Sequence, residues 1–237
     1  MAYQATSEKT AFGALLTMAA GGIDAYSYLA HGSVFSGLQT GNLILLGISI
    51  GRMQWMQTVR YLVSVAAFAA GTIAVRLIQK TDFFEKRTVV RQRCVLLYEM
   101  AILLVVATAN DDMPSFATTI LLSLVAAAEL QEFRRLNNAP FTPLMMTGNV
   151  RTISESLHDW VRYGNLAART RFARTCMVLA GFVCGAILVA LLIPRAGSAC
   201  VLVPFLALSI AQMTLLGKER GRSRPHMETG KDSGIHA

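Results

Sequence analysis

Six long apolar segments dominate this sequence and limit what the chain can fold into. Each is roughly 17 to 22 residues long, which is the length of helix needed to cross the ~30 Å hydrocarbon core of a bilayer. Of the 237 residues, 54% are hydrophobic and 15% are charged, whereas about a quarter of a typical soluble domain is charged. We therefore predict an all-α, polytopic transmembrane helical bundle. Its six predicted spans are 11–30, 58–79, 93–109, 115–133, 172–193 and 198–217.

The basic residues indicate how these helices are oriented. Seventeen of the 22 lysine and arginine residues lie in three regions, 80–93, 134–174 and the stretch after 217. Because cytoplasmic loops carry an excess of Lys and Arg, these regions are predicted to be cytoplasmic, and six crossings then place both termini there. The charge is spread between apolar segments rather than over one basic domain. This pattern argues against nucleic acid as a partner despite the net charge of +8.

The tripeptide Thr40-Gly41-Asn42 recurs as Thr147-Gly148-Asn149, at an offset of 107 residues. Both halves of the chain have one long apolar segment, then a Thr-Gly-Asn segment, then two long apolar segments. Three crossings is an odd number, so the second half is expected to enter the membrane from the opposite side, as an inverted repeat. The expected units are a cytoplasmic segment 1–10, membrane repeats 11–109 and 110–217, and a disordered basic cytoplasmic tail 218–237.

The two Thr-Gly-Asn segments, 39–50 and 146–161, are too short to span a bilayer as regular helices. Thr and Asn oxygens suit the start of a helix, and Gly permits a sharp turn. If both segments enter the membrane, their helix N-termini would attract an anion or an electronegative solute atom near the midplane. The alternative is a pair of capped turns at the membrane surface with no ligand. The second segment is also polar enough to lie in the interface as an amphipathic helix.

Short motifs occur around both Thr-Gly-Asn tripeptides. They are Gly21-Gly22-Ile23-Asp24-Ala25-Tyr26, Phe35, Gln39-Thr40-Gly41-Asn42-Leu43, Gln131, Pro140, Thr142, Pro143 and Met146-Thr147-Gly148-Asn149. Together they resemble the signature of the YoaK family of bacterial membrane proteins, a family defined by a domain of unknown function. Glu132 departs from the family pattern, in which Asn follows the Gln at this point. The resemblance covers about residues 10–217 and implies a multi-pass protein of the bacterial inner (plasma) membrane, without a known reaction or substrate.

Ionisable residues inside apolar segments are costly to bury and are candidates for function. Asp24 and Glu99 are predicted to bind a proton or a cation. We expect Glu129 to have a structural role, snorkelling or paired with Arg134, and His31 to be solvated in a loop. The candidate substrate-binding residues are Asp24, Gln39, Thr40, Gly41, Asn42, Gln131, Thr147, Gly148 and Asn149.

The sequence favours a small-solute transporter or channel whose site lies between the two repeats. A non-transporting assembly or lipid-interacting component is the alternative, and an enzyme acting on lipid is a weaker one because no catalytic motif occurs. The four cysteines have no CxxC spacing, and the four histidines are scattered. We therefore expect no metal or cofactor. The expected partners are the bilayer, a small solute and, as an open question, a second copy of the chain.

Overall fold

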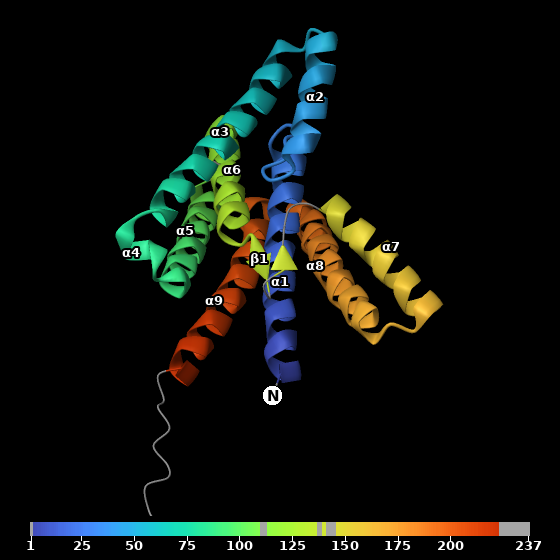
Figure 1. The fold of residues 1–237 in the computed structure, drawn as a ribbon. Coiled ribbons are helices and arrows are strands. Elements are labelled where there is room, and N and C mark those ends of the chain that lie inside the picture. The colour runs from blue at the N-terminus through green and yellow to red at the C-terminus, as the bar shows by residue number, and fades with distance from the viewer. Residues whose placement is uncertain (1, 110–112, 137–138, 141–145, 223–237) are drawn as a thin grey trace, which may run out of the picture.

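The computed structural model describes residues 2–109, 113–136, 139–140 and 146–222, and these residues are almost entirely helical (Figure 1). Two-residue strands β1 (Arg135–Leu136) and β2 (Ala139–Pro140) pair antiparallel. A 3-10 helix, Gly197–Val201, connects the last two α-helices. The α-helices are α1 (Ala2–Ala30), α2 (Gln39–Gly51), α3 (Trp55–Gln79), α4 (Asp82–Glu85), α5 (Thr88–Ala109), α6 (Ser115–Glu132), α7 (Met146–Tyr163), α8 (Leu166–Ala196) and α9 (Leu202–Arg222).

The prediction of an all-helical fold is confirmed, and each predicted apolar segment lies within helical structure. Five of the six segments are contained in a single α-helix or extend one residue beyond it, because a long apolar run satisfies its backbone polar groups internally only as a helix. The sixth segment, 198–217, begins in the 3-10 helix and continues into α9. The two Thr-Gly-Asn segments are α2 and α7. The prediction that the tail 218–237 is disordered is wrong for its first five residues, because α9 continues to Arg222; the rest of the tail lies outside the described residues.

Two stretches of the described chain are long and apolar enough to cross a membrane by length and composition. One is α3, with 25 residues, and the other is the 50 residues from Leu166 to Leu215, which include α8 and most of α9. At 1.5 Å per residue, either stretch is longer than the ~30 Å hydrocarbon core of a bilayer. The count of six crossings stays a prediction.

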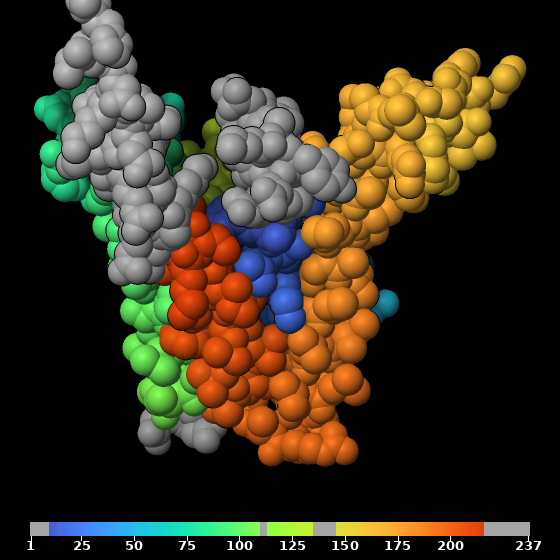
Figure 2. All heavy atoms as spheres, turned by 90° about the horizontal axis from the view of Figure 1, so that it is seen from below, coloured from blue at the N-terminus to red at the C-terminus, as the bar shows by residue number. Residues whose placement is uncertain are grey.

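Helix α1 occupies the centre of the molecule. It packs against α8 and α9, and Figure 2 shows it between these two helices when the molecule is seen from below. Helix α3 packs against α6, while α5 contacts both α6 and α9. The pairs α2–α3 and α7–α8 form two hairpins that extend away from this centre in different directions (Figure 1).

The contact between α1 and α8 depends on small residues. Gly181 and Gly185 lie four residues apart on α8, the spacing of the small-xxx-small pattern that lets membrane helices approach closely. A Cβ atom on Gly185 would overlap the carbonyl oxygen of Met18. One turn away, Thr17 Oγ1 donates a hydrogen bond to the carbonyl oxygen of Val178 at 2.8 Å. The backbones of the two helices are therefore in direct contact.

Apolar side chains both fill the interior and cover much of the outside. Leu16, Leu96, Leu122 and Leu208 come from four different helices and are completely buried in one cluster. Large apolar side chains on α3, α8 and α9 are exposed, and Leu77, Leu191 and Met213 are each more than 60% exposed. Soluble monomers rarely leave contiguous apolar patches of this kind uncovered. The outer surface therefore suits contact with lipid.

Candidate functional site

The connection between α1 and α2 is held against the bundle by Asp24. The Asp24 side chain is 4% exposed, and its Oδ1 atom accepts a hydrogen bond from the backbone N–H of Gly37 at 2.6 Å. The other carboxylate oxygen, Oδ2, is buried without a hydrogen-bond partner among the described residues. One oxygen of Asp24 thus fixes the connection, while the second is free to bind a proton or a cation.

Asn42, the last residue of the first Thr-Gly-Asn motif, is fully buried and holds the same connection in place. Its Oδ1 accepts the backbone N–H of Phe35 at 2.9 Å, and its Nδ2 donates to the Phe35 carbonyl at 2.7 Å. The amide also donates to Gln39 Oε1 and Ser64 Oγ, both at 3.1 Å. Because every polar atom of Asn42 has a partner, this residue positions the connection and has no free polar group for a ligand.

The neighbouring residues of this motif differ in their surroundings. Gln39 donates from Nε2 to the Ser36 carbonyl at 2.7 Å, whereas Thr40 is exposed. A Cβ atom on Gly41 would lie 3.0 Å from the Phe35 ring, so glycine allows the ring to approach the helix. The expectation that Thr or Asn caps this helix is wrong, because the N-cap residue is Leu38 and makes no side-chain cap bond.

The second motif is not built like the first. Thr147 and Gly148 are exposed at the start of α7, and no atom lies within 4 Å of a Cβ placed on Gly148. Asn149 is half-buried, and its Nδ2 donates only a weak bond to Met146 Sδ at 3.5 Å. The approach to this motif that contains Thr142 and Pro143 lies outside the described residues. The two tripeptides are therefore identical in sequence but have different surroundings.

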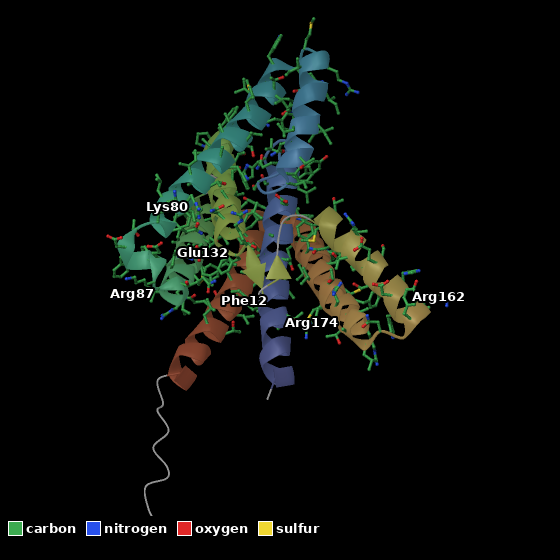
Figure 3. All side chains as sticks on the ribbon, in the orientation of Figure 1. Phe12, Lys80, Arg87, Glu132, Arg162 and Arg174 are labelled. Atoms are coloured by element: carbon green, nitrogen blue, oxygen red, sulfur yellow. The ribbon has the colours of Figure 1, made fainter. Side chains whose placement is uncertain are left out.

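Gln131 belongs to a separate polar cluster at the end of α6. It donates from Nε2 to Gln79 Oε1 at 3.0 Å, and Gln79 donates to Glu132 Oε2 at 2.9 Å. Arg91 Nε reaches both Glu132 oxygens, at 2.8 and 3.0 Å. Figure 3 shows Glu132 on the side of the bundle where Lys80 and Arg87 lie. This cluster connects α3, α5 and α6, and no residue of it contacts the first motif in the bonds described.

Two buried glutamates form the interior part of the candidate site. Glu99 on α5 and Glu129 on α6 are both 0% exposed, and none of their four carboxylate oxygens has a hydrogen-bond partner among the described residues. Glu129 is an electrostatic neighbour of Glu99 and also of Asp24. Buried acids on three helices, α1, α6 and α5, therefore interact electrostatically, and Glu129 is the neighbour of both Asp24 and Glu99.

Two sequence-based interpretations near these acids are wrong. Glu129 does not pair with Arg134, because Arg134 is exposed and the glutamate oxygens lack a partner. His31 is not solvated but buried, with its ring in edge contact with Tyr26 at a centroid distance of 5.1 Å. Sequence reasoning also missed the pairing of Glu132 with Arg91. The available signal was that both are charged residues at the borders of apolar segments predicted to face the same side.

The described residues do not bring three His, Cys, Asp or Glu side chains into a group that can hold a metal ion. Buried carboxyls inside a bundle can accept a proton or a small cation. Buried groups of this kind mark proton and ion pathways in membrane proteins.

Comparison with known proteins agrees with the membrane character of this bundle. The model of the family described as "Protein of unknown function (DUF1275)" matches residues 12–214. The chain is 27% identical over 147 residues to the UPF0700 transmembrane protein YoaK of Bacillus subtilis (strain 168), a match that covers 60% of this chain and 64% of that protein. No solved structure matches the chain. The chain thus belongs to the DUF1275 family and is similar to a protein described as transmembrane.

Proposed function

We propose that this protein carries a small solute across the bacterial inner membrane, coupled to a proton or cation that binds Asp24, Glu129 and Glu99. The observation that carries the proposal is the set of carboxylate oxygens without partners on three different helices of the bundle interior. Burying an ionised carboxylate costs far more than burying a hydrogen-bonded polar group. Buried carboxyls without partners are therefore expected where the protein uses them to bind and release a proton or a cation.

The proposed path runs between two inverted repeats, and the order of helix contacts supports this. If the two repeats are aligned at an offset of 107 residues, α1 corresponds to α6, α3 to α8 and α5 to α9. Under this exchange the α1–α8 contact becomes the α6–α3 contact, and the α1–α9 contact becomes the α6–α5 contact, all of which occur. The two hairpins, α2–α3 and α7–α8, also exchange with each other.

Individual contacts support the same relationship. Thr17 on α1 donates to the carbonyl of Val178 on α8. Adding 107 to residue 17 gives Leu124 on α6, and subtracting 107 from residue 178 gives Gly71 on α3. A Cβ on Gly71 would lie 3.1 Å from Leu124 Cδ2, so this second pair is also in close contact. In this proposal the repeats have opposite orientations and both chain termini are cytoplasmic.

Asp24 is the proposed coupling residue. Its Oδ1 atom fixes the backbone of Gly37, and its Oδ2 atom has no partner. A proton or cation on this carboxylate weakens its attraction for the Gly37 N–H, because charge-assisted hydrogen bonds are roughly twice as strong as neutral ones. Binding at Asp24 would thereby loosen the connection between α1 and α2. This connection is the proposed gate, and Gln39, Thr40 and Gly41 lie next to it.

Proteoliposomes that contain the pH indicator pyranine test this function. Small organic anions, sugars and alkali cations are added in turn, and the change in internal pH is recorded for the wild type. We expect at least one class to drive a proton flux that falls at least tenfold in the Asp24→Asn and Glu129→Gln variants. Glu155→Gln, a change of an exposed acid on α7, is the matched control and should leave the flux unchanged. Equal fluxes in all variants contradict the proposal. So does the combined absence of a proton flux with any class and of solute uptake driven by an alkali-cation gradient in the same vesicles.

One observation favours the alternative of a non-transporting assembly component. The polar atoms of Asn42 are all satisfied within the chain. Both carboxylate oxygens of Glu132 likewise have partners within the chain, in Arg91 and Gln79. Under this alternative, Asp24→Asn reduces the amount of folded protein in the membrane and changes no flux. Measuring folded protein and flux on the same vesicles separates the two functions.

A further inference from the structure

The outer face of α7 carries an apolar stripe that the described part of the protein leaves uncovered. Helix α7 makes its main contacts with α8, through residues such as the fully buried Ser156. Val150, Leu157 and Val161 expose 50%, 40% and 74% of their surface. At about 100° per residue, these three side chains fall within roughly 40° of one another on the helix. The stripe therefore runs along most of α7.

Basic side chains border this stripe. Arg151 and Arg162 are both exposed, and they fall within about 20° of each other and roughly 100° around the helix from the apolar side chains. Arg151 forms an ion pair with Glu155 at 2.8 Å, but both side chains are more than half exposed, so this pair contributes little stability and can exchange partners. Figure 3 shows Arg162 at the far end of the hairpin, away from the centre of the bundle.

The start of α8 adds further positive charge beside α7. Arg169 and Arg171 are exposed, and Arg169 lies over the Trp160 ring at 5.5 Å, which connects the two helices. The whole hairpin has six arginines and two acidic residues. Its exposed tip carries Tyr163 and Leu166, an aromatic and an apolar side chain suited to the border between headgroups and acyl chains.

We propose that α7 lies in the plane of the membrane interface and binds anionic phospholipid headgroups through Arg151 and Arg162. A helix with one narrow apolar face bordered by arginines is typical of elements that rest at this depth of a bilayer. Juxtamembrane basic residues are attracted to anionic lipids on the cytoplasmic leaflet. A second copy of the chain suits this surface less well. A stable interface buries about 800 Å² per partner, which is more than three small aliphatic side chains supply.

A fluorescent probe on α7 of the full-length protein tests this inference. The four native cysteines are replaced by serine, Val161→Cys is labelled with the polarity-sensitive dye NBD, and the protein is reconstituted into phosphatidylcholine bilayers with or without phosphatidylglycerol. We expect blue-shifted emission with phosphatidylglycerol and a return toward water-like emission at high salt. A probe at Glu155→Cys, on the polar face, should stay water-like in every bilayer.

Removal of the arginines gives the second part of the test. Each basic residue near an anionic surface strengthens association by about fivefold, so Arg151→Gln with Arg162→Gln should lower the ratio of lipid-inserted to exposed probe by roughly 25-fold. Arg195→Gln, at the opposite end of α8, is the matched charge control. The proposal is overturned if the emission wavelength is the same with and without phosphatidylglycerol, or if probes on two copies of the chain quench each other.

Discussion

The close contact between α1 and α8 predicts a large effect from a small substitution. In Gly185→Ala the new Cβ atom would overlap the carbonyl oxygen of Met18, which is backbone and cannot rotate away. The helices must separate, which typically costs about 1–3 kcal/mol in a well-packed core. Separation also weakens the bond from Thr17 Oγ1 to the Val178 carbonyl, worth about 0.5–1.5 kcal/mol. We expect a loss of about 2–4 kcal/mol in the free energy of unfolding.

The assay uses Cys200, which is 1% exposed and reacts with a thiol-specific dye only on unfolding. The other three cysteines are replaced by serine, and the detergent-solubilised protein is heated in the presence of the dye. For a chain of 237 residues each kcal/mol shifts Tm by roughly 2–4 °C, so Gly185→Ala should lower Tm by about 5–15 °C.

Gly47→Ala is the matched control for this prediction. A Cβ atom at Gly47 meets nothing within 4 Å, and alanine favours a helix over glycine by about 1 kcal/mol. This variant should keep or slightly raise Tm. If both substitutions change Tm equally, close backbone packing of α1 on α8 is not what stabilises the bundle.

Two further substitutions test the polar clusters. Asn42→Ala removes both bonds to the Phe35 backbone. The Phe35 N–H then loses its partner, at a cost of about 1–3 kcal/mol, whereas the Phe35 carbonyl still accepts a bond from Ser64 Oγ at 2.9 Å. Limited proteolysis should therefore cut the α1–α2 connection faster, and an unchanged cleavage rate would argue against the role of Asn42. Glu132→Gln leaves Arg91 without its charged partner and should lower the free energy of unfolding by about 3 kcal/mol. The double variant Arg91→Met with Glu132→Leu should recover most of this loss in a denaturant titration. If the double variant instead loses the sum of the two single-variant losses, Arg91 and Glu132 are not a coupled buried pair.

The helices could be predicted from the sequence because their cause is local. An apolar run of bilayer length satisfies its own backbone groups only as a helix, and α3 and α6 begin and end within a few residues of the predicted segments. The 3-10 helix before α9 was not predicted, because Ser198 and Cys200 interrupt neither the apolar pattern nor its length. Local composition therefore gives the spans but not the local helix type.

The candidate site was only partly predictable because its contacts are long-range. Asp24 was identified since a carboxylate inside an apolar segment is conspicuous. Glu129 was assigned to Arg134 by distance along the chain, although α6 ends at Glu132 and Arg134 lies beyond it, so helical spacing does not bring the two side chains together. The role of Asn42 depends on the fold of the connection to Phe35, and no sequence pattern indicates that fold.

Accessibility of the two Thr-Gly-Asn segments tests the central claim, a solute path between inverted repeats, most directly. Thr40 and Thr147 are exposed, so cysteine at either position reacts without unfolding. In a background without native cysteines, Thr40→Cys and Thr147→Cys are treated with a membrane-impermeant maleimide on right-side-out and inside-out vesicles. We predict that position 40 reacts only from the periplasmic side and position 147 only from the cytoplasmic side. Labelling of both positions from the same side would contradict the inverted repeat and the path between its halves.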